Sequence, residues 1–428
     1  MLPDPLVNDD VPTLATTSTR PRLEGLDRVR AVADAPVPRV RTVRRASAAR
    51  SDASVALVLG TRPEIIKLAG ISRLLGRAGY IIHSGQHYDA TLSAAFFTTY
   101  GLPEPRVRLT GVGGASRAEQ FAAVILQLGH QLERERPAAV VVQGDTNTAA
   151  AAAQAAHFAG IPLVHVEAGL RSFDRAMPEE INRRLIGVVA DLHCAPTEVS
   201  AENLRREGVA AQAIRVTGNT TVDATIESLP GPARSAAVLG DLGLQSGGFV
   251  LATIHRPENT DDVGKLSSIL GSLAGLTLPV VLPLHPRTLA CVERFGLRPL
   301  LDRIRTLEPI DHPAFLALAG HARLLVSDSG GMQEECTVLK RPLVVIRNST
   351  ERPEAVAAGF AVLVAADHGL ASRLAAAVAD DRWPADLAGR SSPFGDGRAS
   401  ERIAAAILEL VDEGQQSSNP PTSVHSSS

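Results

Sequence analysis

Two carboxylates stand at positions that stability alone does not favour. Asp145 directly follows the apolar run "AAVVVQG" (138–144), and Glu167 lies near the end of the run "IPLVHVEAG" (161–169). Asp is unfavourable in strands and common as a helix N-cap, so Asp145 taken alone indicates a cap. Glu167 shares one face of a predicted strand with His165, two residues earlier. A strand-end carboxylate in a cleft is a candidate general acid or base.

Basic residues that could bind phosphate follow the first apolar run. The segment "GTRPEIIKLA" (60–69) turns from a predicted strand into a predicted helix. Gly60 permits a close approach of the backbone, Arg62 can contact phosphate in a bidentate way, and Lys67 adds a point charge. A plain turn with a solvated Arg and Lys explains this segment equally well.

A second phosphate motif, "SDSGGMQEE" (327–335), follows the apolar run "ARLLV". Ser329, Gly330 and Gly331 would open a helix whose free N–H groups and positive dipole end suit a diphosphate. Glu335, about one turn later, could accept hydrogen bonds from ribose hydroxyls. The ordinary alternative is an Asp or Ser N-cap with an acidic residue early in the helix.

Further polar motifs surround these segments. "MPEEINRR" (177–184) predicts a helix start with Pro178 in its first turn, where Glu179 and Arg183 form an i,i+4 pair. For most such helices this is an exposed, salt-bridged turn. His255 in "TIHRPEN" (253–259) ends another predicted strand beside Arg256, a pair that could bind phosphate or stabilise a leaving group. The spacing does not decide whether Gln86, His87 and His285 are ligand contacts or parts of polar turns.

The elements that carry these motifs alternate between short β-branched runs and Ala/Leu-rich helical stretches. Continuous apolar strands separated by helices predict parallel sheets that are covered on both faces. The alternation weakens around 215–235 and then restarts, so we expect two doubly wound, Rossmann-like α/β domains with a boundary near residue 220. Ligands of such sheets bind outside the carboxyl ends of the strands, which predicts a cleft between the domains.

The expected organisation divides the chain into a disordered, Arg-rich leader (1–51), a first Rossmann-like domain (52–220), a second domain (221–395), a helix that packs back on the first domain (396–412) and a disordered tail (413–428). A formal net charge of −3 disfavours nucleic acid or an anionic membrane as the main partner. No apolar run approaches the roughly 18 residues of a membrane span. Three widely spaced cysteines fit a reducing compartment, and no GxGxxG fingerprint of a nicotinamide site opens the chain.

Taken together, the motifs resemble those of the non-hydrolysing UDP-N-acetylglucosamine 2-epimerase family. The resemblance extends from about residue 54 to about residue 412, and it rests on GTRPE with Lys67, QGDT, HVEAGLR, PEEINR, HRPEN, SDSGG-QEE and ERPEA, in that order. It implies a two-domain fold like that of the B-type glycosyltransferases, with the nucleotide bound in the cleft, mainly by the second domain. It also implies a homodimer, a cytoplasmic location and a part in the biosynthesis of cell-surface polysaccharides.

The reaction that the resemblance implies accounts for the strand-end carboxylates. UDP is eliminated from C1 while a base removes the proton on C2, and UDP then adds back as a proton reaches the other face of C2. The two faces of the sugar need acid/base groups on both sides. No redox cofactor and no metal is required, and the only small-molecule partner is the UDP-sugar.

Roles follow from the resemblance, motif by motif. It implies acid/base carboxylates at Asp145, Glu167 and Glu179, and a catalytic or phosphate-stabilising group at His255. It implies substrate contacts by Arg62, Lys67, Arg183, Ser329, Gly330, Gly331 and Glu335. Gln86, His87 and His285 are candidate contacts of a second, allosteric UDP-sugar. Arg352 of "ERPEA" receives no catalytic role, only the positioning of the preceding loop.

Several alternatives stay open at this point. The segment "SGQHYDATLSAAFF" (84–97) is similar to a branch of the family that includes enzymes acting on UDP-2,3-diacetamido uronic acids. A B-type glycosyltransferase would share the fold and the nucleotide site, a hydrolysing epimerase would release free N-acetylmannosamine, and an inactive regulator would bind nucleotide sugar without turnover.

Overall fold

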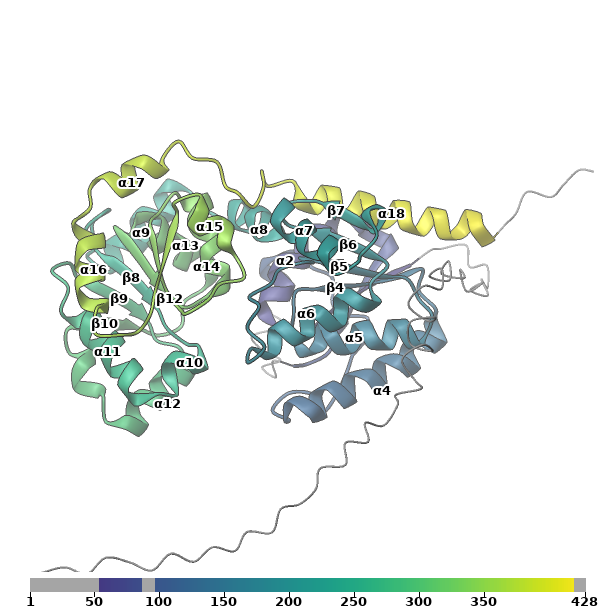
Figure 1. The fold of residues 1–428 in the computed structure, drawn as a ribbon, viewed down its shortest axis with the longest axis horizontal. Helices are drawn as coiled ribbons and strands as arrows, with labels where there is room; N and C mark the ends of the chain where they lie inside the picture. Colours follow the sequence, from purple (N-terminus) through teal and green to yellow (C-terminus); the bar gives the residue numbers. More distant parts are fainter. Residues whose placement is uncertain (1–53, 87–96, 419–428) are drawn as a thin grey trace, which may run out of the picture. The chain divides into compact units, whose positions relative to one another are not determined.

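The computed structural model of the protein describes residues 54–86 and 97–418 (Figure 1). The predicted leader, His87 and the last part of the predicted tail lie outside the described residues. Within the described residues two parallel sheets alternate with helices, and this confirms the predicted pair of doubly wound α/β domains. No helix in the described part of the chain is long and apolar enough to cross a membrane.

The first sheet has seven parallel strands in the order β3-β2-β1-β4-β5-β6-β7. Their bounds are β1 (Val55–Leu59), β2 (Gly79–His83), β3 (Val107–Arg108), β4 (Ala139–Gln143), β5 (Leu163–Val166), β6 (Leu192–Ala195) and β7 (Ile214–Val216). The central strands β1 and β4 are buried at every residue, as expected for a parallel sheet covered on both faces.

Helices cover both faces of the first sheet. Their bounds are α2 (Arg62–Leu75), α4 (Arg117–Glu135), α5 (Asn147–Phe158), α6 (Pro178–Val189) and α7 (Glu198–Arg206). Alternate residues of β1 point to opposite faces, so Leu57 packs in a core with α2, while Val58 packs in a core with α4, α5 and α6. The alanines of α5 are almost completely buried and let this helix lie close to the sheet.

The second sheet has six parallel strands in the order β10-β9-β8-β11-β12-β13. The strands are β8 (Val250–Thr253), β9 (Val280–Pro283), β10 (Ile304–Leu307), β11 (Leu324–Ser327), β12 (Leu343–Ile346) and β13 (Ala361–Val364). The helices from α8 onward are α8 (Thr220–Ser228), α9 (Pro232–Asp241), α10 (Pro257–Thr260), α11 (Val263–Ala274), α12 (Pro286–Phe295), α13 (His312–His321), α14 (Gly330–Leu339), α15 (Pro353–Ala357), α16 (Leu370–Ala379) and α17 (Arg382–Leu387).

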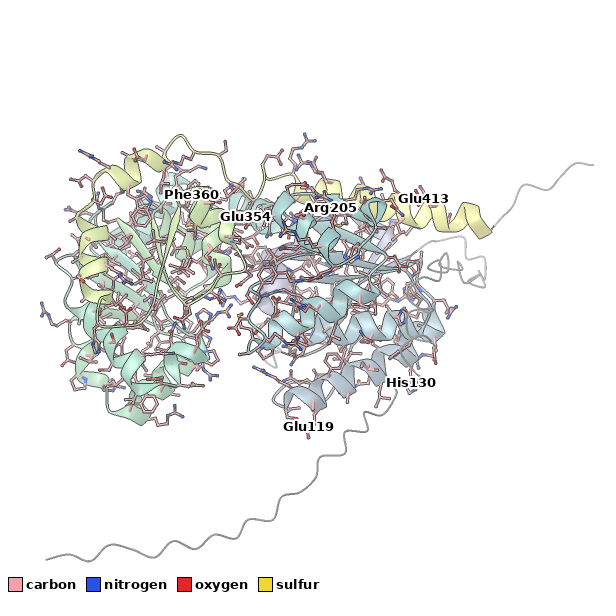
Figure 2. All side chains as sticks on the ribbon, in the orientation of Figure 1. Glu119, His130, Arg205, Glu354, Phe360 and Glu413 are labelled. Atoms are coloured by element: carbon pink, nitrogen blue, oxygen red, sulfur yellow. The ribbon has the colours of Figure 1, made fainter. Side chains whose placement is uncertain are left out.

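Two apolar cores hold this second sheet between its helices. One contains residues of α11, α12 and α16, and the other contains residues of α13, α14 and α15 together with Phe249 and Phe360. Both phenylalanines are completely buried, and Phe360 immediately precedes β13 (Figure 2).

The chain crosses between the two sheets twice, and the crossings lie side by side. The first follows β7, and in the second the carbonyl of Phe394 accepts a hydrogen bond from the backbone N–H of Asn219 (2.8 Å). Gly218 and Gly395 both have left-handed backbones, with φ of 87° and 120°, and a Cβ on Gly395 would lie 3.1 Å from the Cα of Gly218. Glycine at both positions therefore allows the close approach of the two segments.

The last helix, α18 (Ala399–Ser418), returns to the first sheet (Figure 1). Ile403 and Ile407 lie in the same core as Leu57, and the carboxylate of Asp223 accepts hydrogen bonds from the first N–H groups of the helix, at Ala399 (3.2 Å) and Ser400 (2.7 Å). The helix continues to Ser418, so the tail predicted from residue 413 is wrong in its first part. The polar stretch after Val411 prolongs the helix although it has no apolar pattern of its own. The domain boundary near residue 220 stays a prediction.

Candidate active site

The predicted motifs gather at the carboxyl ends of the central strands. In each sheet the strand order reverses at one place, between β1 and β4 in the first and between β8 and β11 in the second. The loops that follow these four strands carry GTRPE, QGDT, HRPEN and SDSGG, respectively. Ligands of open α/β sheets bind at such reversal points, because the two adjacent loops diverge and leave room between them.

Glu64 fixes the first of these loops. Its carboxylate accepts hydrogen bonds from the N–H groups of Gly60 (2.9 Å) and Thr61 (2.8 Å) and from the hydroxyl of Thr146 (2.6 Å). Burial raises the pKa of Glu64, and these hydrogen bonds oppose the shift. A Cβ at Gly60 would lie 1.9 Å from Ser84 Oγ, so the loop needs glycine there. Sequence reasoning missed Glu64: the T-x-x-E pattern of a capping box could have indicated its bonds to this loop, whereas no local pattern indicates its bond to Thr146.

Glu167 lies one residue beyond the strand that was predicted to contain it. Strand β5 ends at Val166, and Glu167 has a left-handed backbone with φ of 65°. The prediction that it shares a strand face with His165 is therefore wrong, because the alternation of sides ends with the strand. The His165 ring instead donates from Nε2 to the carbonyl of Gly144 (2.9 Å), and burial lowers the pKa of His165 to about 3.

The Glu167 carboxylate is held by three donors from distant segments. Lys67 Nζ lies 2.5 Å and Gln143 Nε2 2.6 Å from Oε2, and Arg352 Nη2 lies 2.9 Å from Oε1. Lys67 also lies 3.8 Å from the buried carboxylate of Glu334. The structure thus places Lys67 beside these two carboxylates, and its contact with the substrate stays a prediction.

The electrostatics of this cluster favour a basic carboxylate. Burial raises the pKa of Glu167; Lys67 and Arg352 oppose the shift, Glu334 adds to it, and the pKa stays raised. Burial would lower the pKa of Lys67, but the two neighbouring carboxylates outweigh it and raise that pKa. Lys67 therefore keeps its proton, while Glu167 binds one more readily than an exposed glutamate does, as a general base requires.

Arg352 joins this cluster to the second domain, a role that sequence reasoning missed. Its guanidinium donates to Glu334 Oε1 (2.6 Å) and to Glu351 as well as to Glu167. Glu334 Oε1 also accepts from Asn219 Nδ2 (2.7 Å), at the first crossing between the sheets. Arg352 and Glu167 are 185 residues apart in sequence, so no local pattern could have paired them.

Asp145 forms a second, more open cluster with Arg183. Arg183 donates from Nε to Asp145 Oδ2 (2.8 Å) and from Nη1 to Glu180 Oε2 (2.8 Å). Glu180 is completely buried and is the carboxylate of the PEE motif that joins the cluster. Glu179, the predicted one, is half-buried and forms no ion pair with any residue that the structure describes. The interpretation of this turn as exposed is wrong for Glu180 and Arg183.

Glu351 connects the two clusters. It is buried, its Oε1 lies 4.0 Å from Arg183 Nη2, and it also accepts from Arg352. A continuous series of ion pairs thus runs from Asp145 through Arg183, Glu351 and Arg352 to Glu167. The strand-end motifs of both sheets are therefore parts of one charged network.

His255 is oriented by Asp328. The Asp328 carboxylate is completely buried and accepts from the backbone N–H groups of His255 (3.0 Å) and Arg256 (2.9 Å) and from Asn259 Nδ2 (3.1 Å), with His255 Nδ1 3.2 Å away. Burial lowers the pKa of His255, and Asp328 opposes this shift. The interpretation of Asp328 as the cap of the following helix is wrong, because its oxygens serve the His255 loop.

The SGG segment has the form of an anion site. Ser329 is the N-cap residue of α14 with an extended backbone, and its side chain makes no capping hydrogen bond within the described structure. Gly330 and Gly331 form the first turn. A Cβ at Gly330 would lie 2.8 Å from Arg352 Nη1 and 3.0 Å from Glu351 Oε1, so the ion network itself requires glycine here. The first N–H groups of such a helix suit a phosphate.

Arg62 and Glu335 come together beside this helix. Arg62 opens α2; burial lowers the pKa of Arg62, and the nearby Tyr100, Asp311 and Glu335 oppose the shift. Glu335 Oε1 lies 3.0 Å from His312 Nε2, a partner that no motif predicted. The two residues come from different sheets, so their proximity supports a nucleotide site lined by both.

The candidate allosteric residues are only partly described. The side-chain Oε1 of Gln86 accepts from the backbone N–H (3.0 Å) and the hydroxyl (2.7 Å) of Thr148, in the first turn of α5. His285 is exposed, precedes α12 and has its ring centroid 5.4 Å from that of His255. His87 lies outside the described residues. Their allosteric role stays a prediction.

The described residues contain no group of three or more His, Cys, Asp or Glu side chains that could hold a metal ion. The three cysteines are free and buried.

Comparisons with known proteins agree with this arrangement. The family model described as UDP-N-acetylglucosamine 2-epimerase matches residues 77–408. The UDP-N-acetylglucosamine 2-epimerase of Methanocaldococcus jannaschii is 37% identical over 82% of this chain and 98% of that protein. The UDP-2,3-diacetamido-2,3-dideoxy-D-glucuronate 2-epimerase of Pseudomonas aeruginosa is 35% identical over 82% of this chain and 99% of its own.

A solved structure gives the same result. The crystal structure of the M. jannaschii enzyme in complex with UDP-GlcNAc and UDP has a TM-score of 0.76 at 37% identity, and the match covers 83% of this chain and 99% of that one. The fold and the strand-end motifs therefore define a two-domain, GT-B-like α/β protein. More narrowly, the chain belongs to the UDP-N-acetylglucosamine 2-epimerase family, which confirms the resemblance found in the sequence.

Proposed function

We propose that the protein is a non-hydrolysing isomerase that converts UDP-N-acetylglucosamine to UDP-N-acetylmannosamine. The observation that carries this proposal is the ion-pair network from Asp145 to Glu167, which brings acid/base carboxylates of the first sheet together with Arg352 and Glu351 of the second. A glycosyltransferase has less need of several carboxylates around C2, so the network favours epimerisation.

The reaction balances without an external reagent. A base removes the C2 proton while the C1–O bond to UDP breaks, which gives 2-acetamidoglucal and UDP. The UDP oxygen then adds back to C1 as a proton is delivered to the opposite face of C2. Charge grows on the departing diphosphate, so preorganised cationic groups and backbone N–H groups lower the barrier.

The proposed roles follow the two clusters. Glu167 and Asp145 exchange protons with C2, with Glu179 as a further candidate, and Arg183 holds Asp145. Lys67 and Arg352 hold Glu167. The diphosphate lies at the start of α14, with His255 stabilising its charge, and the uridine ribose lies at Glu335. The assignment of each carboxylate to one face of C2 is left to experiment.

Proton NMR in D2O tests the reaction. Purified protein incubated with UDP-N-acetylglucosamine should yield UDP-N-acetylmannosamine that carries deuterium at C2, with no net release of UDP. Free N-acetylmannosamine would show a hydrolysing epimerase instead. Transfer of the sugar to an added acceptor would show a glycosyltransferase, and binding without turnover would show a regulator.

A second candidate substrate is a UDP-2,3-diacetamido uronic acid. The supporting observation is the P. aeruginosa relative, whose identity of 35% is close to the 37% of the M. jannaschii relative. The two substrates differ at C3 and C6 but share the groups that react, the UDP on C1 and the hydrogen on C2, so the same carboxylates serve both. Turnover of each compound in separate reactions, compared as kcat/KM, decides between them.

We further propose a cytoplasmic homodimer that acts in the synthesis of cell-surface polysaccharide, with neither nucleic acid nor membrane as a partner. Three buried, unpaired cysteines support a reducing compartment. Light scattering of the purified protein tests the dimer.

A further inference from the structure

Three side chains from three separate segments form a line of hydrogen bonds beside the start of α14. The Tyr100 hydroxyl lies 2.8 Å from His312 Nδ1, and His312 Nε2 lies 3.0 Å from Glu335 Oε1. Tyr100 precedes β3 of the first sheet, His312 opens α13, and Glu335 lies within α14. Tyr100 and His312 are each 9% exposed, so water has little access to the hydrogen bond between them.

The chemistry of the three groups fixes the direction of this line. A carboxylate only accepts, so His312 must donate from Nε2 to Glu335. In the neutral ring Nδ1 then accepts, and the Tyr100 hydroxyl donates to it. Ser228 hydrogen-bonds the Tyr100 oxygen from α8, which anchors the far end of the line. Each member therefore limits the rotation of the next.

The hydrogen bond from His312 holds Glu335 at Oε1. Its other oxygen is oriented by the same contact, because the carboxylate is planar. Arg62 lies close enough to interact with both Glu335 and Tyr100. Glu335 is on α14, the helix whose N-terminus, Ser329–Gly331, is the candidate phosphate site. A vicinal diol next to a diphosphate is the group that such an oriented carboxylate recognises.

We infer that His312 and Tyr100 are positioning residues that hold Glu335 for the two ribose hydroxyls, and that they set the preference of the site for ribonucleotides over deoxyribonucleotides. This inference rests on the proposed function, because it needs a nucleotide at α14. It adds two residues, one from each domain, that no motif in the sequence indicated.

The test measures the preference for ribose and not affinity alone. Calorimetry with the full chain gives the dissociation constants of UDP and of 2′,3′-dideoxy-UDP for the wild type, His312→Phe, His312→Gln and Tyr100→Phe. His312→Phe should reduce the preference for UDP by about tenfold, as expected for one hydrogen bond to a charged group. Its affinity for dideoxy-UDP should change by less than about twofold, because that ligand lacks both hydroxyls.

The other two variants should reduce the preference for UDP over dideoxy-UDP by smaller factors. His312→Gln keeps a donor near Nε2 and should retain most of the preference, while Tyr100→Phe removes only the second hydrogen bond and should cost about threefold. His321→Gln, at the opposite end of the same helix, is the matched control and should leave both constants unchanged. If His312→Phe does not fold, His312→Gln and Tyr100→Phe carry the test.

Two results would overturn the inference. An equal loss for both nucleotides would show a merely structural role, and an unchanged preference in all variants would show that Glu335 needs no positioning. If the wild type epimerises the sugar and the variants give either of these results, this inference alone is refuted. A wild type that binds no UDP refutes the proposed function together with it.

Discussion

The loops after β4 and β5 each carry a carboxylate within two residues of the strand end, yet the left-handed backbone falls on different residues. Before Asp145 the left-handed residue is Gly144, with φ of 68°, whereas in the next loop it is Glu167 itself, with φ of 65°. The side chain of Asp145 is 29% exposed and has one cationic partner, while that of Glu167 is 4% exposed and has two. A non-glycine residue in this conformation costs about 1–3 kcal/mol and is typical of functional sites.

The difference separates the environments of the two carboxylates that we propose as proton-transfer groups. Asp145 is accessible and lies on an unstrained backbone. Glu167 is desolvated, and burial raises its pKa against the pull of Lys67 and Arg352. Glycine would relieve the backbone at Glu167 but would remove the carboxylate, so the residue type there is explained by chemistry and not by stability.

The largest expected effect is on turnover. Asp145→Asn and Glu167→Gln should each reduce kcat by at least about a hundredfold, because each removes a proposed proton-transfer group. Asp145→Asn should leave UDP binding nearly unchanged. Glu401→Gln, an exposed glutamate of α18, is the control and should retain full activity. If Asp145→Asn folds normally but no longer binds UDP, Asp145 positions the ligand and the comparison of two proton-transfer groups fails.

The next largest effect is on stability. Arg352→Met should lower the free energy of unfolding by about 3–5 kcal/mol, because it leaves Glu167, Glu334 and Glu351 buried without their common partner. Arg205 lies on α7 (Figure 2), and its ion-pair partners among the described residues are the exposed Glu198 and Glu202. Arg205→Met should therefore change stability by less than about 0.5 kcal/mol. Urea denaturation measures both. Equal effects would mean that the network around Glu167 contributes no more than a surface pair.

The acid dependence of stability should distinguish Glu351 from Glu167. Burial opposes ionisation of Glu351, but Arg352, Arg347, Arg183 and Arg256 outweigh it and hold its pKa well below the usual 4.5. Its ionised form therefore stabilises the fold above about pH 4.5, and this contribution is lost as the pH falls below that value. The pKa of Glu167 is shifted in the opposite direction.

Unfolding free energies between about pH 3 and pH 7, a range that contains the ordinary glutamate pKa of 4.5 below which the loss begins, measure this contrast. Glu351→Gln should flatten the loss of stability in acid, whereas Glu167→Gln should not. A flattened profile for both variants would show that the two carboxylates contribute alike to acid unfolding.

The sequence predicted the central strands better than the edges. Runs such as "AAVVVQG" and "ARLLVSD" became β4 and β11, because burial on both faces leaves a continuous apolar segment. Strands β3, β7 and β10 lie at sheet edges and have exposed residues. Their sequences therefore lack the continuous apolar segment that identifies a strand buried on both faces.

The site was predictable where a motif follows a strand and unpredictable where partners are distant. Asp145, Glu167 and the SGG segment stand at strand ends, so the sequence singles them out, and their roles in the site stay predictions. The choice between Glu179 and Glu180 depends on which side of α6 faces Asp145, and adjacent glutamates give no hint of it. Arg352 and His312 meet their partners only through the fold, since their contacts join segments of opposite domains or separate helices.

The smallest effect tests the backbone difference directly. A Cβ at Gly144 would meet nothing within 4 Å, so Gly144→Ala changes only the backbone preference and should destabilise the protein by about 1 kcal/mol. Gly129 lies inside α4, where a Cβ also meets nothing within 4 Å, and Gly129→Ala should instead stabilise by about 0.5–1 kcal/mol. Thermal or urea unfolding measures the two opposite signs. If Gly144→Ala is neutral, left-handed backbone costs little in this sheet, and the conformation of Glu167 loses its significance as stored strain.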